Sequence, residues 1–458
     1  EEEGVRAASG FASQKFRFQT KWETADKTYR LSLAGMNLNQ ETAGYVSDYT
    51  NRIIAKSNND QNAFRDAWSL RTALKIEQSL TNGKLTLTPY ARLNDMTFKM
   101  HFLSTADPVE KNSHQSIGLL SAYQRPLEGE HLFIGGLDLD LTKGTLWQFQ
   151  TNPPRFGYLP GLHYDYEVEA QTLSPYLHIE WQLTPVTRLT SGVRYDLTQY
   201  RYDNLTDEGA FGRFLRPADR DDNFDTFSPK LGVTHQTGNR VIFANLSRGA
   251  RAPQTTDLYR LRTGQIVGGI KPETLDSAEI GLRTNHDYIQ FEITAYKMQK
   301  ENYYFRDSNS ENVSNGKTKH EGIEATLKAN LSEQISINAS ASYARHLYQF
   351  THAPNSIVSG LDIDSAPRKM ARAGISYSPS SKWGFEADWH YVGKYATDEA
   401  NAHFYDGHNL FDMGITWRPD DALSMDLKIE NVLDRNYAHR ADYAFGAARY
   451  FPGDPRRW

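Results

Sequence analysis

The feature of this sequence that most limits its fold is an alternation of apolar and polar residues with a period of two. In residues 335–343 one set of alternate positions is apolar or aromatic, and the other is small and polar: Ile335, Ile337, Ala339, Ala341 and Tyr343 against Ser336, Asn338, Ser340 and Ser342. The pattern recurs at 137–141, 289–294, 385–391 and 423–430. Because successive side chains of a strand point to opposite faces, the pattern predicts strands with one dry face and one wet face.

Two all-β folds accommodate such strands. In an antiparallel sandwich or propeller the apolar faces pack inward, whereas in a transmembrane barrel they face lipid and the polar residues face a wide lumen. The mean hydropathy is −0.65, and no run of 18 apolar residues occurs, so a helical membrane protein is excluded. A barrel is not excluded, because its signal is alternation.

The connections between the predicted strands favour the barrel. About nine short turns, several with turn residues such as Asn82-Gly83 and Gly238-Asn239, alternate with about nine long loops. Eighteen connections predict about nineteen strands. An outer-membrane barrel has short periplasmic turns and long extracellular loops, whereas a sandwich has no reason to keep every long loop at one end. We therefore predict an all-β fold, a large antiparallel transmembrane β-barrel.

The composition excludes several kinds of site and partner. The 458 residues include no Cys, which excludes a disulfide scaffold, a Cys-ligated metal and a cysteine nucleophile. The formal net charge is −5, so no basic excess is present to bind nucleic acid. The 14 His show no metal-ligand spacing, and the seven Met are scattered. We predict no metal site, no intrinsic cofactor and no nucleic-acid partner.

Three motifs resemble the barrel of a TonB-dependent outer-membrane receptor. The first runs from Asn245-Leu-Ser-Arg-Gly-Ala-Arg-Ala-Pro253 through Asp257-Leu-Tyr259 and Lys271-Pro-Glu273 to Ser277-Ala-Glu-Ile-Gly281. The second is Ile429-Glu-Asn-Val-Leu-Asp-Arg-Asn-Tyr437, near the end of the chain, and the third is Gly316-Lys-Thr-Lys-His-Glu-Gly-Ile-Glu324. They stand in the family's order and spacing, and the resemblance covers the chain from about residue 14 to its end.

The resemblance implies a domain organisation. Barrels of this family have 22 strands, behind an N-terminal plug domain that binds TonB, and no plug is readable here. We therefore expect residues 1–458 to be a partial barrel with about 19 of 22 strands visible, lacking the plug and about three N-terminal strands. We also expect a last strand that begins near Ala447 and is cut short.

The resemblance also implies a function. We expect energised import of a scarce metal chelate, most of all a ferric siderophore, with iron present only as part of the cargo. The partners would be TonB, through the missing plug, the chelate, and outer-membrane lipid with lipopolysaccharide. Haem, cobalamin or an oligosaccharide are alternative cargoes, and a passive porin is an alternative transporter. No nucleophile motif supports a lipid-modifying enzyme, so we predict that the protein is no enzyme.

Ligand contacts are expected on the long loops and at the outer rim. Arg260 and Arg262 lie in a basic loop suited to an anionic chelate. Arg345, His346 and Tyr348 precede another long loop, and His163, Tyr164 and Tyr166 follow a third. The alternative for the aromatic residues is a girdle at the membrane interface, with Arg345 at lipid headgroups. Arg251 and Tyr259 belong to the family motif, and a structural role explains them better than ligand contact.

Overall fold

The computed structural model describes residues 4–99, 108–155, 157–307 and 312–458. Eighteen strands form one curved sheet. Its strands are β1 Phe11–Glu23, β2 Lys27–Glu41, β3 Phe64–Leu80, β4 Gly83–Lys99, β5 Val109–Leu127, β6 His131–Gln150, β7 Gly161–Thr184, β8 Thr187–Asn204, β11 Arg220–Thr237, β12 Arg240–Arg251, β14 Glu273–Asn285, β15 Ile289–Arg306, β16 Asn312–Asn330, β17 Ile335–Tyr348, β18 Lys369–Ser380, β19 Trp383–Val392, β22 His408–Trp417 and β23 Met425–Ile429.

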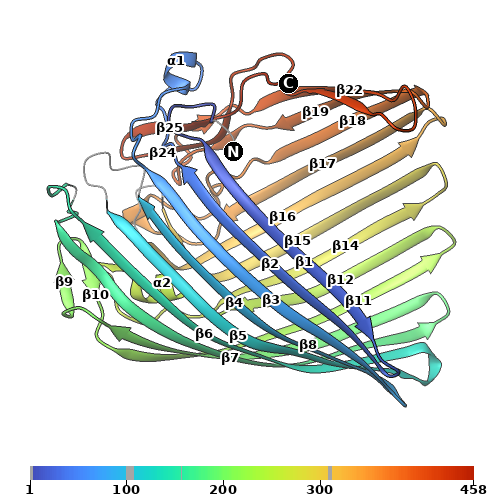
Figure 1. Ribbon diagram of the computed structural model, residues 1–458, viewed down its shortest axis with the longest axis horizontal. Coiled ribbons are helices and arrows are strands. Elements are labelled where there is room, and N and C mark those ends of the chain that lie inside the picture. Colours follow the sequence, from blue (N-terminus) through green and yellow to red (C-terminus); the bar gives the residue numbers. More distant parts are fainter. Residues whose placement is uncertain (1–3, 100–107, 156, 308–311) are drawn as a thin grey trace.

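Every strand of this sheet pairs antiparallel with the sheet strand that precedes it in the chain. The two edges are β1 and β23, and the described residues contain no pairing between them. Figure 1 shows the sheet curving into a wall that encloses a lumen. The predicted large antiparallel barrel is confirmed.

The expected nineteenth strand, beginning near Ala447, does not join this wall. β25, Ala447–Pro452, instead forms a two-stranded hairpin with β24, Ala438–Ala444. Phe445 and Gly446, both at positive φ, make the turn between them. Tyr450 bridges to Val46 in the loop after β2. The segment thus belongs to the loop structures, and the wall has 18 strands where about nineteen were expected.

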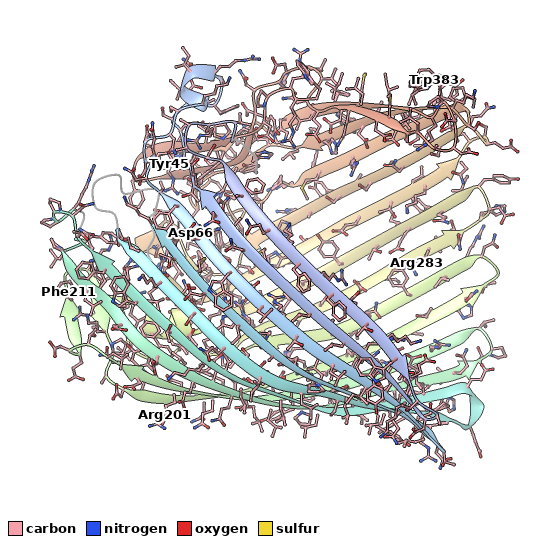
Figure 2. The ribbon with its side chains drawn as sticks, in the orientation of Figure 1. Tyr45, Asp66, Arg201, Phe211, Arg283 and Trp383 are labelled. Atoms are coloured by element: carbon pink, nitrogen blue, oxygen red, sulfur yellow. The ribbon has the colours of Figure 1, made fainter. Side chains whose placement is uncertain are left out.

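The two ends of the wall differ, as the alternation of short and long connections predicted. The short turns lie together at one end, beside Trp383, and the long connections lie at the other, with Tyr45 and Phe211 (Figures 1 and 2). The long connections carry the remaining small elements: α1 Arg52–Ala55, β9 Gly209–Phe211, β10 Phe214–Arg216, α2 Thr255–Tyr259, β13 Leu261–Arg262, the 3-10 turn Ala353–Asn355, β20 Tyr395–Ala396, β21 Phe404–Tyr405 and the β24–β25 hairpin. One further 3-10 turn, Glu128–Glu130, joins β5 to β6.

The two faces of the wall differ in the predicted sense. Apolar side chains on its outer face are exposed, such as Phe18 on β1, Leu246 on β12 and Ile280 on β14. Their neighbours in sequence point to the opposite face, where Arg283 of β14 is seen from the lumen side in Figure 2. An exposed apolar band around a polar interior is the arrangement of a barrel whose outer surface contacts lipid. Within the described ranges, no helix is long and apolar enough to cross a membrane.

Candidate functional site

A polar hollow lies on the inner face of the wall, over strands β11 to β17. Its volume is about 770 Å³, within the range of pockets that hold small molecules. The residues that line it are Thr234, Val241, Phe243, Asn245, Leu275, Glu279, Arg283, Glu292, Thr294, Tyr296, Met298, Lys300, His320, Glu324 and His346. We call this region the lumen hollow.

The charges of the lumen hollow are paired across neighbouring strands. Arg283 Nε donates to Glu292 at 2.5 Å, and the Asn245 amide donates to Glu279. The Lys300 ammonium contacts the Glu273 carboxylate and lies 4.0 Å from the centre of the Tyr303 ring. Because Arg283 remains exposed to the lumen, its other donors are free to meet a ligand. The hollow therefore offers cationic donors, aromatic faces and acceptors together.

The strand register explains the first family motif. Arg251 and Glu273, which stand in separate pieces of the motif, are directly opposite each other on β12 and β14, and Arg251 donates to Glu273 at 2.6 Å. Asn245 and Glu279 are likewise opposite partners. The motif thus fixes the pairing of two strands, which supports the structural role weighed for Arg251.

The second motif shapes the turn after β23. Asn431 and Asp434 both have positive φ, a conformation that Asn and Asp tolerate better than most residues. The Asn431 side chain accepts from Arg435 N–H and donates to the carbonyls of Arg435 and Asp454, and Asp434 pairs with Arg52 at 2.5 Å. This motif therefore connects the end of the wall to the long loops.

Three of the predicted ligand residues lie inside a packed aromatic cluster beneath the long connections. His163 has no exposed surface, and its ring nitrogens contact Gln148 at 3.0 Å and the Leu159 carbonyl at 2.7 Å. Tyr164 donates to the Leu261 carbonyl, and Tyr166 packs against Tyr202 and Tyr259. These side chains are neither on an outer girdle nor at a surface that a ligand reaches, and they hold the loops together.

Tyr348 is also buried, in a second cluster with Val313 and Ile357. Its hydroxyl donates to Asp364 at 2.9 Å. Burial raises the pKa of the Asp364 carboxyl, because the charged carboxylate loses its hydration there. Tyr348 therefore packs inside the loops, and its predicted contact with a ligand stays a prediction.

Arg260 and Arg262 flank Leu261 but differ in environment. The Arg260 guanidinium contacts the Glu110 carboxylate, which is 2% exposed and also accepts from Gln148 at 2.7 Å. Arg262 lies on β13, opposite Phe214 of β10, and its backbone N–H donates to Gln265. Arg260 thus has a buried partner that a ligand would have to displace.

Arg345 and His346 point to opposite faces of β17. His346 lines the lumen hollow, so Arg345, its neighbour in sequence, faces outward beside Glu321 of β16. This position fits the lipid-headgroup interpretation of Arg345, because it lies on the face opposite the lumen hollow. His346 is the one predicted residue that lines the lumen hollow.

The sequence prediction missed most of the lumen hollow, including Arg283, Tyr296, Lys300 and His320. Alternation had placed the wet positions of 289–294 toward the lumen. The signal that would have singled them out is the register of three strands, because these residues are up to 37 positions apart in sequence, from Arg283 to His320. In the part of the chain that the structure describes, no group of three His, Cys, Asp or Glu side chains is placed to hold a metal ion.

Comparison with known proteins agrees with this architecture. The family described as "TonB dependent receptor-like, beta-barrel" matches residues 5–432. The vitamin B12 transporter BtuB of Vibrio vulnificus (strain YJ016) is 24% identical over 313 residues, which cover 61% of this chain and 47% of the relative. The chain thus spans about half the length of that curated relative.

Two solved structures share the fold. The unliganded ferric citrate transporter FecA superposes with a TM-score of 0.83 at 15% identity, covering 98% of this chain and 69% of that one. The ferric-catecholate import receptor Fiu of E. coli K12, in its closed form, gives a TM-score of 0.76 at 15% identity, covering 99% and 74%. Likeness at this identity concerns the fold alone.

Proposed function

This chain belongs to the TonB dependent receptor-like β-barrel family, and from that premise we propose that it imports a ferric siderophore across the outer membrane. Members of the family are receptors and transporters of Gram-negative outer membranes, and TonB-dependent receptors work with TonB on small-molecule ligands. The choice of cargo is our own proposal and rests on the chemistry of the lumen hollow.

The observation that carries the proposal is the donor set of this hollow. Arg283 and Lys300 supply positive charge, and Tyr296 with the two histidines supplies aromatic faces and neutral donors. Ferric siderophores are usually anionic or rich in oxygen acceptors, and charge-assisted hydrogen bonds bind such groups strongly. A hollow of about 770 Å³ suits a ligand of this size.

In the mechanism that we propose, the long connections admit the chelate and the hollow holds it at the inner wall. A plug domain closes the lumen, and TonB acts on that plug so that the cargo can pass along the hollow, whose Arg283 lies near the short-turn end. No residue of the wall performs chemistry on the chelate in this scheme. The wall provides positioning and electrostatics only.

Cobalamin is the second candidate, because the sequence relatives include vitamin B12 transporters. A corrinoid is larger and less acidic than most siderophores, so it would depend more on the aromatic faces than on Arg283. The two cargoes therefore predict different responses to removal of a lumen charge.

The experiment is a growth assay of a deletion strain, with and without TonB, on a panel of ferric siderophores, haem, cobalamin and oligosaccharides. The proposal predicts a TonB-dependent defect on at least one ferric siderophore and normal growth on the others. A growth defect confined to cobalamin would identify cobalamin as the cargo in place of a siderophore. Uptake that persists without TonB would indicate a porin.

Binding measurements then test the hollow itself. Arg283→Gln should weaken binding of the identified anionic chelate by about tenfold or more, because a hydrogen bond to a charged group contributes roughly 1.5–3 kcal/mol. Arg248→Gln is the matched control, since Arg248 makes a comparable ion pair with Asp276 at 2.6 Å on the outer face. Equal affinity in both variants would remove Arg283 from the ligand site.

We also propose that the outer face contacts lipopolysaccharide. Above the apolar band, the outward positions of β12 and β14–β18 carry an excess of basic side chains: Arg248, Lys297, Lys317, Lys319, Arg345 and Lys369 against Asp276, Glu301 and Glu321. Phosphate groups of the lipid headgroup would pair with this belt. Replacing Lys297, Arg345 and Lys369 by Gln should reduce the lipopolysaccharide that copurifies with the protein, and unchanged copurification would contradict the contact.

A further inference from the structure

Three metal-ligating side chains lie in one row across the inner wall. Met298 of β15 is directly opposite His320 of β16, and His320 is directly opposite His346 of β17. Opposite partners in antiparallel strands project to the same face, with Cβ atoms about 4.5–5.5 Å apart. All three side chains line the lumen hollow, which is open to solvent.

The two histidine rings already converge. Their Nδ1 atoms are 2.8 Å apart, and the ring centres are separated by 5.0 Å at an interplanar angle of 54°. A contact of this length between two neutral imidazoles requires one N–H and one lone pair, so a single proton lies between two potential ligand atoms. A metal ion between the two Nδ1 atoms would be bound by both rings after a small rotation of each, with the Nδ1 proton moving to Nε2 of the same ring.

The surroundings orient one of these rings as metal sites commonly do. The far nitrogen of His320, Nε2, is 2.9 Å from Thr318 Oγ1, which fixes the ring from behind. On β17, the backbone carbonyl of His346 accepts from Ile363 N–H at 2.8 Å, which anchors the strand end at this point. The Thr318 contact thus holds the His320 ring with its Nδ1 toward Nδ1 of His346.

Met298 decides which metal suits the row. Two imidazoles alone fit zinc, nickel, iron or copper, but a thioether is a soft ligand that favours copper, above all Cu(I). The flexible Met side chain reaches across one strand spacing without strain. Glu279 and Glu324 add negative charge to the hollow, and the nearby Lys300 is paired with Glu273.

We propose that Met298, His320 and His346 form a copper site on the lumen wall, with one coordination position open to water or to a donor of an incoming molecule. This site takes the ion itself. It shares His320 and His346 with the hollow proposed for the ferric chelate, but copper binding by the purified chain can be measured whatever the cargo is. It draws on a thioether and two imidazoles from three strands, so motif spacing along the chain does not reveal it.

The test is competitive titration of the purified full chain in detergent with Cu(I), against a chromogenic Cu(I) chelator. One copper ion per chain is expected. His320→Ala with His346→Ala should weaken binding by about 100-fold or more. Thr318→Val, which keeps both rings, should weaken it by about 10–100-fold, the usual effect of losing a partner that orients a ligand. Met298→Leu should lower affinity for Cu(I) more than affinity for Zn(II).

The matched control is His235→Ala with His286→Ala, two histidines at the short-turn end, which should leave copper binding unchanged. Heat-dependent gel mobility confirms that each variant is folded, and growth on ferric siderophores tests the proposed import separately. Absence of copper binding by the wild-type chain, or equal affinity in the double histidine variant, would overturn the proposal. Equal binding of zinc and copper, unaffected by Met298→Leu, would overturn the assignment to copper.

Discussion

At the scale of single residues, burial decides what a charged side chain does. The Arg260 side chain is 22% exposed and contacts Glu110, whose side chain is 3% exposed. A carboxylate in so dry a place is tolerated only while its charge is compensated. The sequence places Arg260 in a basic loop, and the structure makes it the partner that permits Glu110 to be buried.

Replacing Arg260 by Ala is therefore expected to destabilise the loops by about 3 kcal/mol, the low end of the range for breaking a buried ion pair. Hydrogen exchange of the amides in residues 158–166 and 255–262 measures this local stability. Adding Glu110→Gln should restore most of the loss, because the neutral amide needs no counter-charge. Exchange rates in Arg260→Ala equal to those of the wild type would contradict the assignment.

Asp364 predicts a dependence of loop stability on pH. Burial is the main cause that raises its pKa, and the hydrogen bond from Tyr348 lowers it in part. A carboxyl whose pKa is raised by folding stabilises the fold when protonated. This contribution is fully present below the pKa of unfolded Asp, about 3.9, and is lost as the pH rises through the folded pKa.

Asp364→Asn should thus raise the thermal stability of the loops at pH 7 and have little effect near pH 4. Near-ultraviolet circular dichroism of the buried tyrosines measures this stability. Asp362→Asn is the matched control. Asp362 pairs with Arg368 at 2.7 Å, so this variant should be less stable than the wild type at pH 7. A destabilised Asp364→Asn protein at pH 7 would show that the carboxylate form is the one favoured in the fold.

At the scale of elements, close approach of strands explains one motif glycine. A Cβ at Gly322 of β16 would lie 2.7 Å from the Tyr343 carbonyl oxygen and 2.8 Å from the Tyr296 hydroxyl. Both contacts are too short, so any side chain here displaces the tyrosine that lines the lumen hollow or the neighbouring strand. The third family motif therefore places glycine where a tyrosine crosses the inner wall.

Gly322→Ala is expected to cost roughly 1–3 kcal/mol, as overpacking commonly does. Gly249→Ala on β12 is the control, because a Cβ there meets nothing within 4 Å, and the change should be neutral within about 0.5 kcal/mol. Urea unfolding in detergent, followed by gel mobility, compares the two. Equal stability of the two variants would show that the groups around Gly322 can move to accommodate a side chain.

Individual elements were predictable where the information is local. Alternation within β17 or β23, and turn residues such as Asn82-Gly83, specify strands and hairpins without reference to the rest of the chain. The segment Ala447–Pro452 also reads as a strand, but its partner is set by the tight turn at Phe445-Gly446, which joins it to β24. Pairing partners at the loop end depend on three-dimensional contacts that no local pattern contains.

At the scale of the whole molecule, the orientation of the two faces governs insertion into a membrane. Ile280 of β14 is 57% exposed on the outer face, whereas Thr294 on β15 lines the lumen hollow at the same level of the wall. Ile280→Lys is expected to cost about 2–4 kcal/mol in a bilayer, and Thr294→Lys much less, because the lumen is wet. Folding into lipid vesicles measures both, and equal losses would contradict the assignment of the faces.

The candidate site was less predictable than the fold. His346 was predicted as a ligand contact and lines the lumen hollow, but His320 and Met298 become its neighbours only through the register of three strands. Conversely, His163, Tyr164 and Tyr166 have the composition of a ligand-binding rim, and only the packing of β10 and α2 above them shows that they form a core. Aromatic residues at the end of a strand serve either role, and the covering segment decides between them.

The pairing of each wall strand with its predecessor has a consequence for assembly and descent. Ladder formation can proceed strand by strand, because each new strand pairs with the sheet strand just before it in the chain, across either a short turn or one long loop. Duplication or loss of a hairpin would leave every other ladder in register. The number of strands in such a wall can therefore change during evolution, whereas the length of each strand is fixed by the thickness of the bilayer.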